Sequence, residues 1–149
     1  MKFIGLLYFA TFIVLLTGCS NRYPKHILSH KNIYNDTLYQ WSKDSAILIF
    51  TGNMSVNTLP IPLPAGKYTI WFSAEGTKAE NSLPVMGLFL DNGFICYQNI
   101  EEGLHQYKIN FETASATNDS LMLEFRNYFS SPTEQRTIFL HFPIVLQPY

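Results

Sequence analysis

The sequence has little of what nucleic-acid binding, disulfide frameworks or the common catalytic sites require. Charged residues make up 14% of the 149-residue chain, and ten basic residues face eleven acidic ones, which leaves no basic surplus for DNA or RNA. The chain contains no Gly-x-Ser-x-Gly, no His-Glu-x-x-His, no glycine-rich phosphate loop and no cysteine and histidine spacing typical of a metal site. We therefore expect neither a nucleic-acid partner nor an enzyme.

The first nineteen residues have the layout of a secretory leader. Met1 and Lys2 give a short positive start, residues 3–16 are an almost unbroken apolar run, and Leu16-Thr17-Gly18-Cys19 ends it. This segment resembles a bacterial lipoprotein signal, which implies cleavage before Cys19, lipid on its thiol and attachment to a membrane. An uncleaved transmembrane helix is the alternative, but the apolar stretch is shorter than the roughly 20 residues that a span prefers. Ser20 favours the outer membrane over the inner one if the host is Gram-negative.

Cysteine usage and composition then suggest how the chain is organised. Lipidation of Cys19 leaves Cys96 as the only other cysteine, so no intramolecular disulfide is expected and Cys96 is predicted to be a small buried residue. Residues 20–36 are polar and have no sustained period. We predict a signal peptide over residues 1–18, a lipidated N terminus and polar tether over 19–36, and one domain over 37–149.

Short apolar runs separated by turn residues fill the predicted domain. Residues 67–74, 107–111 and 121–125 alternate apolar and polar side chains, which is the period of a half-buried strand. Asp-Asn-Gly at 91–93 is a tight-turn signal. The predicted strands are 47–50, 67–74, 85–90, 94–97, 107–111, 121–125 and 138–144. About eight strands at this spacing, without a convincing helical period, indicate an all-β antiparallel β-sandwich.

Four segments follow one another in an order typical of a family of sugar-binding domains. They are Leu63-Pro64-Ala65-Gly66-Lys67-Tyr68-Thr69-Ile70, Ala74-Glu75-Gly76-Thr77, residues 84–93 and residues 125–137. Over residues 50–146 the chain resembles the calcium-dependent xylan-binding type of carbohydrate-binding module, which is a galactose-binding-like jelly roll. The resemblance implies a jelly-roll sandwich that binds a carbohydrate without transforming it.

The chain departs from this family where calcium is held. The family's calcium aspartates fall on Tyr128 and Gln135, which carry no negative charge. Calcium takes about six to eight oxygen ligands, and Asn127 and Glu134 supply too few. We therefore expect no metal site and no cofactor, a weak calcium site being the most that the sequence permits.

The same region supplies the candidate ligand-binding residues Asn127, Tyr128, Phe129, Glu134 and Arg136. Aromatic rings can stack on the apolar face of a sugar ring, while amides and charged groups hold its hydroxyls. A structural interpretation is also open. In that interpretation Asn127 shapes the loop by bonding its own backbone, and Glu134 forms a surface ion pair with Arg136.

Trp71 is a sixth candidate, because strand alternation places it on the opposite face from Tyr68, Ile70 and Phe72. Its alternative role is packing beneath residues 37–50 with the indole N–H bonded to the backbone.

The sequence thus favours a membrane-anchored lipoprotein of the cell envelope whose domain binds an envelope or extracellular glycan. The alternative is a structural or assembly lipoprotein that docks an envelope protein through the sandwich. An exposed aromatic cluster flanked by amides would favour the glycan, whereas a broad exposed apolar patch would favour a protein partner.

Overall fold

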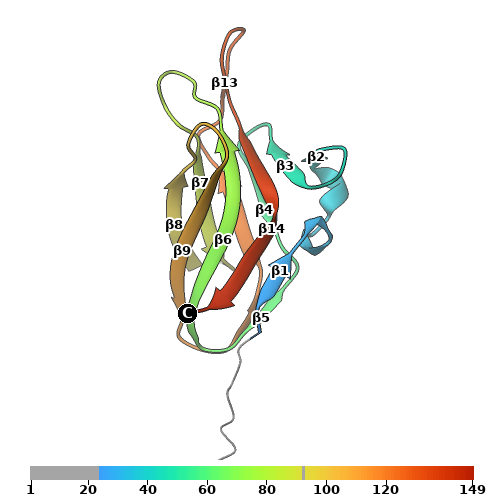
Figure 1. The fold of residues 1–149 in the computed structure, drawn as a ribbon, viewed down its shortest axis with the longest axis vertical. Coiled ribbons are helices and arrows are strands. Elements are labelled where there is room, and N and C mark those ends of the chain that lie inside the picture. Colours follow the sequence, from blue (N-terminus) through green and yellow to red (C-terminus); the bar gives the residue numbers. More distant parts are fainter. Residues whose placement is uncertain (1–23, 92) are drawn as a thin grey trace, which may run out of the picture.

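The computed structural model describes residues 24–91 and 93–149, which form two antiparallel sheets stacked as layers (Figure 1). The larger, six-stranded sheet has the order β2-β3-β14-β6-β9, with β1 also paired to β14. The smaller sheet has the order β4-β11-β7-β8. Two further pairs, β5 with β10 and β12 with β13, form short two-stranded sheets. The predicted all-β antiparallel sandwich is confirmed.

The longer strands coincide with the apolar runs of the sequence, and most of the additional strands are short. The larger sheet contains β1 (His26–Leu28), β2 (Gln40–Trp41), β3 (Ile47–Phe50), β6 (Gly66–Gly76), β9 (His105–Thr113) and β14 (Ile138–Pro148). The smaller sheet contains β4 (Met54–Asn57), β7 (Val85–Leu90), β8 (Gly93–Asn99) and β11 (Leu121–Phe125). The remaining elements are β5 (Ile61–Leu63), β10 (Thr117–Asp119), β12 (Phe129–Ser130), β13 (Gln135–Arg136) and the 3₁₀ helices η1 (His30–Asn32) and η2 (Asp36–Leu38).

Alternation along the strands fills the space between the two sheets. β6 buries its even-numbered residues from Tyr68 to Ala74, and β11 buries its odd-numbered residues from Leu121 to Phe125. Phe50 of the larger sheet meets Phe125 of the smaller one edge to face, with ring centroids 6.4 Å apart. Burial of a large apolar side chain stabilises the fold by roughly 1.5–3 kcal/mol. The core between the sheets therefore holds the two layers together.

The domain begins earlier than the sequence predicts, because part of the expected tether is folded. β1 pairs with β14 in the register His26 to Leu146, and both Leu28 and Ile33 are buried. Polar residues in this segment close turns instead of forming a spacer, as when Asn32 Oδ1 accepts the backbone N–H of Ser29 at 2.8 Å. The prediction of a tether through residue 36 is thus wrong from His26 onward.

Residues 1–23 lie outside the described part of the chain. They include Cys19 and the whole predicted signal peptide. In residues 24–91 and 93–149, no helix has the length and apolar character needed to cross a membrane.

The two ends of the sandwich differ. β1 starts opposite Leu146, and the Tyr149 backbone N–H bonds the Lys67 carbonyl at 3.1 Å, so both ends of the described domain lie at one end of the sandwich. We call this end the base. The β12–β13 hairpin projects from the other end, which we call the hairpin end (Figure 1).

Candidate functional site

Asn127 lies at the hairpin end, where it joins β11 to the start of β7. Its Oδ1 accepts the Val85 backbone N–H at 2.7 Å, and its Nδ2 donates to the Leu83 carbonyl at 2.9 Å. The side chain is half-buried. Its bonds are therefore to the backbone of another segment and not, as considered above, to the loop's own backbone.

Arg136 is buried beneath the hairpin and binds three backbone carbonyls. Its Nε donates to Ser82 at 3.2 Å, and its two terminal nitrogens donate to Ala79 at 2.6 Å and to Asn127 at 2.5 Å. The side chain is only 7% exposed. These bonds tie the hairpin to the segment that precedes β7.

Glu134 binds the same segment through a different partner. Its Oε2 accepts the backbone N–H of Glu80 at 2.9 Å. In the part of the chain that the structure describes, the ion pair considered between Glu134 and Arg136 is not formed, because both side chains bond backbone groups of residues 79–82 instead.

Tyr128 and Phe129 are half-buried and are also held by neighbours. The Tyr128 ring packs edge to face on Phe125 at 6.1 Å, and its hydroxyl accepts a hydrogen bond from Gln135 Nε2 at 3.2 Å. The Arg136 guanidinium lies over the Phe129 ring at 5.9 Å. Tyr128 and Gln135, the positions where the resemblance implies calcium aspartates, thus contact each other without charge.

Trp71 lies apart from the other five candidates, on the outer face of the larger sheet. Its cross-strand neighbours are Lys108 and Val145, and the Lys108 ammonium lies 5.2 Å from the ring centroid. A bond from an indole N–H to the backbone, as considered for Trp71, is made by Trp41, which donates to the Asp36 carbonyl at 2.8 Å.

A different group of side chains, some exposed and some half-buried, lies on the outer face of the smaller sheet. The strand registers place Ser55, Glu124, Gly87 and Tyr97 in one row across β4, β11, β7 and β8, and Asn57, Met122, Phe89 and Phe94 in the next. Side chains that face each other in this way are direct neighbours. We call the surface formed by Ser55, Asn57, Phe89, Phe94, Tyr97, Met122, Glu124 and Arg126 the aromatic face.

Three rings pack together on the aromatic face. The Phe94 and Tyr97 centroids are 4.8 Å apart, and Phe89 lies 5.5 Å from Phe94 and 6.4 Å from Tyr97. Phe94 is 57% exposed and Tyr97 is 49% exposed. A Cβ atom at Gly87 would lie 2.9 Å from a Phe89 ring carbon and 3.1 Å from a Tyr97 ring carbon. Both rings therefore lie over the bare backbone of Gly87.

A β-bulge brings Phe94 and Tyr97 to the same side of the sheet. Residues three apart on a regular strand point to opposite faces. The register between β7 and β8 shifts here, since Cys96 opposes Leu88 but Phe94 opposes Phe89, which leaves Ile95 as the extra residue. Ile95 and Cys96 both pack toward the core. The bulge thus turns two adjacent side chains inward and the two flanking rings outward.

Polar groups flank the rings. Arg126 Nε lies 3.2 Å from Glu124 Oε2, and an Arg126 terminal nitrogen donates to the Tyr97 hydroxyl. The guanidinium carbon lies 5.7 Å from the Tyr97 ring centroid. A hollow of about 340 Å³ beside this group is lined by Asn53, Met54, Ser55, Glu124, Phe125 and Arg126. A second hollow, of about 510 Å³, lies toward the base and is lined in part by Tyr34, Asn57, Asp91 and Met122.

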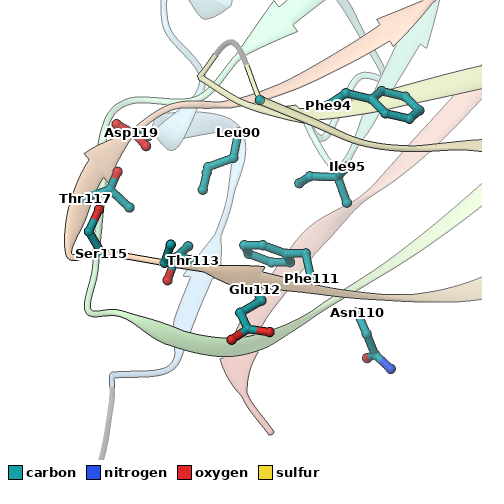
Figure 2. A pocket seen from close by; sticks show the side chains of 12 residues that line it. Leu90, Phe94, Ile95, Asn110, Phe111, Glu112, Thr113, Ser115, Thr117 and Asp119 are labelled. Atoms are coloured by element: carbon teal, nitrogen blue, oxygen red, sulfur yellow. The ribbon is translucent and has the colours of Figure 1, made fainter.

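A third hollow, of about 390 Å³, lies at the base between β8 and β9. Figure 2 shows Leu90, Ile95 and Phe111 on one side of it and Thr117 and Asp119 on the other, with the Phe94 ring directed away. The Phe111 ring is itself stacked on Tyr68 at 5.6 Å. This hollow offers a ligand less aromatic surface than the aromatic face does.

Metal-binding and titratable groups give no further site. In residues 24–91 and 93–149, no three His, Cys, Asp or Glu side chains lie close enough together to hold a metal ion. Burial raises the pKa of the Cys96 thiol, which disfavours the reactive thiolate.

Comparison with solved structures places the domain among known folds. The chain is similar to the C-terminal family 6 carbohydrate-binding module of LamC, a marine laminarinase from Zobellia galactanivorans, with 8% identity, a TM-score of 0.56, and coverage of 83% of this chain and 99% of that one. It is also similar to a family two carbohydrate esterase from Cellvibrio japonicus, with 12% identity and a TM-score of 0.52, over 85% of this chain and 34% of that one. A third likeness is to the acetyl xylan esterase Est2A from Butyrivibrio proteoclasticus, with 13% identity and a TM-score of 0.51, over 85% of this chain and 32% of that one.

The chain thus spans the whole of the binding module but about a third of each esterase. No protein-family model matches the chain, and no curated protein matches it. The fold is the jelly-roll sandwich of carbohydrate-binding modules.

The sequence predicts one part of the aromatic face and not the other. Glu124 and Arg126 alternate with the buried Leu123 and Phe125, so their outward direction was predictable from the period of β11. Phe94 and Tyr97 were not predictable as a pair, because a regular strand separates them onto opposite faces. Their shared direction depends on the bulge at Ile95.

Proposed function

We propose that this domain binds a glycan through the aromatic face. The observation that carries the proposal is the cluster of Phe89, Phe94 and Tyr97, two of whose rings are about half exposed, beside the polar groups of Ser55, Asn57, Glu124 and Arg126. The apolar face of a pyranose stacks on such rings, and neighbouring amides, hydroxyls and charged groups bond its hydroxyls. The likeness to a carbohydrate-binding module supports this choice of ligand.

We infer binding without chemical transformation. Hydrolysis of a glycosidic bond takes two carboxylic groups that flank the bond, and in the two central rows of the aromatic face Glu124 is the one carboxylate. That carboxylate is bonded to Arg126. The hairpin residues proposed from the sequence act in this scheme as a structural clasp, because Asn127, Glu134 and Arg136 all bond the backbone of residues 79–85.

We also propose that the protein is exported and held in the cell envelope by lipid on Cys19, with outer-membrane residence in a Gram-negative host. The support is Leu16-Thr17-Gly18-Cys19 after an apolar run. Since β1 begins at His26, residues 19–25 would connect lipid and domain, and seven residues span at most about 25 Å. The aromatic face would then operate close to the membrane that carries the protein.

Glycan binding is tested with the full-length protein in detergent against a panel of polysaccharides, by affinity electrophoresis and calorimetry. Tyr97→Ala and Phe94→Ala should each weaken binding by about 1–3 kcal/mol, the order found when a stacked ring is removed. Trp71→Ala, on the other sheet, is the matched control and should leave affinity unchanged.

Two results would overturn the assignment of the site. If Tyr128→Ala and Phe129→Ala abolish binding in folded protein while Tyr97→Ala does not, the site lies at the hairpin. If no glycan binds, and an envelope protein captured by the wild type is lost with Tyr97→Ala, the aromatic face is a protein-docking surface.

Lipid anchoring has its own test. Cys19→Ser should leave an uncleaved precursor or release the protein from the membrane fraction, because the thiol is the acceptor of the lipid. Unchanged fractionation and unchanged mature mass would contradict the anchor, and recovery of the wild type in the inner-membrane fraction would contradict outer-membrane residence.

A further inference from the structure

Glu124, Arg126 and Tyr97 form a connected group on the aromatic face. Arg126 Nε lies 3.2 Å from Glu124 Oε2, and the same guanidinium donates to the Tyr97 hydroxyl and covers part of the Tyr97 ring. The Arg126 side chain is 52% exposed and that of Glu124 is 25% exposed. The arginine therefore lies where a ligand stacked on Tyr97 would meet it.

The charge of this arginine is what matters for ligand choice. A guanidinium is permanently charged and presents a planar fork of donors that matches carboxylate and sulfate groups. Across the eight residues that define the aromatic face, Arg126 is the single basic side chain. An unpaired Arg126 would thus give this surface a preference for anionic glycans.

Glu124 removes that preference, because it occupies one edge of the fork and compensates the charge. Arg126 directly follows the end of β11 and lies two residues after Glu124, and its guanidinium reaches back to the Glu124 carboxylate on the outer face of the sheet. The opposite neighbours of Glu124 are Ser55 and Gly87, neither of which competes for its carboxylate with a positive charge.

We infer that Glu124 is the residue that sets the charge selectivity of the aromatic face: by neutralising Arg126 it makes the face select neutral glycans over glycans that carry carboxylate or sulfate groups. Glu124 acts here as a positioning residue, since it holds and compensates the arginine that adjoins the ligand. The inference rests on the proposed glycan binding and adds to it the charge class of the ligand.

The test measures a ratio of affinities in the full-length protein. The probes are a neutral gluco-oligosaccharide and the same oligosaccharide with uronic acid groups, each titrated against wild type, Glu124→Gln, Arg126→Gln and the double variant. Wild type should bind the neutral probe more tightly. Glu124→Gln should raise the anionic-to-neutral affinity ratio by roughly 3- to 30-fold, the order expected for one unmasked charge near a protein surface.

Charge and structure are separated by two further measurements. Binding of the anionic probe to Glu124→Gln should weaken steeply between 20 and 300 mM salt, over which the Debye length falls from roughly 21 to 6 Å. The double variant should return the anionic-to-neutral affinity ratio toward the wild-type value. Glu75→Gln, on β6 of the other sheet, makes the same charge change away from this face and should not alter the ratio.

The outcomes distinguish the two proposals. A wild type that binds the anionic probe as tightly as the neutral one, or a Glu124→Gln variant that lowers stability without changing the ratio, overturns the role of Glu124 while glycan binding stands. Failure of both probes and of the wider panel to bind wild type overturns glycan binding itself, and this inference with it.

Discussion

Replacement of Arg136 by methionine tests whether the hairpin end is a structural clasp or a binding site. The change keeps an unbranched, largely apolar stem but removes the guanidinium group, with its charge and all its donors. The carbonyls of Ala79, Ser82 and Asn127 then lose their partner, and the segment before β7 loses its attachment to the hairpin.

The structure sets the expected magnitude. A hydrogen bond to a charged group contributes about 1.5–3 kcal/mol, and a buried acceptor that loses its partner typically costs about 1–3 kcal/mol. Some of the three carbonyls regain water when the loop relaxes, so the loss should fall near 3–5 kcal/mol in total and not at the sum of three separate bonds. For a domain of this size that corresponds to a fall of about 10–20 °C in the unfolding midpoint.

Chemical denaturation followed by tryptophan fluorescence measures the free energy of unfolding of each variant. Arg136→Lys should recover only part of the loss, because one ammonium cannot reach three carbonyls in the geometry of a planar fork. Glu134→Gln is the control from the same hairpin, and it should change stability by less than about 1 kcal/mol because its single bond to Glu80 is exposed. The clasp is refuted if Arg136→Met unfolds within 0.5 kcal/mol of wild type, a margin on the order of an ordinary surface substitution.

Three other perturbations have definite outcomes. Gly87→Ala should weaken glycan binding more than it lowers stability, because the new Cβ pushes on the ring ends of Phe89 and Tyr97; equal affinity in wild type and variant would contradict this. The Cys96 thiol should react slowly with Ellman's reagent in native protein and rapidly in urea, since burial raises its pKa. Because the pKa of Cys96 is raised in the folded state, its contribution to stability is present below the unfolded-state pKa and is lost as pH rises through the folded-state pKa. Cys96→Ala should therefore make the protein lose less stability as the pH becomes alkaline. EDTA and millimolar calcium should give the same unfolding midpoint, and a rise of several degrees with calcium would show that a site exists.

The layers of this fold were predictable because its long strands report their burial directly in the sequence. β6 and β11 alternate apolar and polar residues with period two, and the buried set in each is the apolar set. The segment from His26 to Asn32 gave no such signal. Its strand has only three residues, and polar side chains such as that of Asn32 form hydrogen bonds within turns. The amino-acid composition of this folded segment is therefore the same as that of a linker.

The hairpin residues and the aromatic face were less predictable than the fold, for different reasons. The hairpin residues were found from a resemblance, and the structure brings five of them together, yet three of these side chains bond backbone groups of residues 79–85. The aromatic face depends on where one extra residue enters β8. Without an extra residue between Phe94 and Tyr97, one of the two rings would lie on the inner side, and no local rule of composition places a bulge there.

The clasp and the aromatic face are connected, because β11 and the two residues after it contribute to both. Glu124 and Arg126 point outward to the rings, Phe125 points inward to the core, and the next residue, Asn127, bonds the backbone at the start of β7. β7 in turn carries Phe89 and the bare backbone of Gly87 on which the rings rest. A ligand stacked on Phe94 and Tyr97 of β8 would therefore lie beside β7 and β11, whose adjoining ends are fixed to each other by an amide and a buried guanidinium. Loop residues that bind no ligand themselves can thus keep the binding surface rigid, and a preformed surface loses less conformational entropy when it binds.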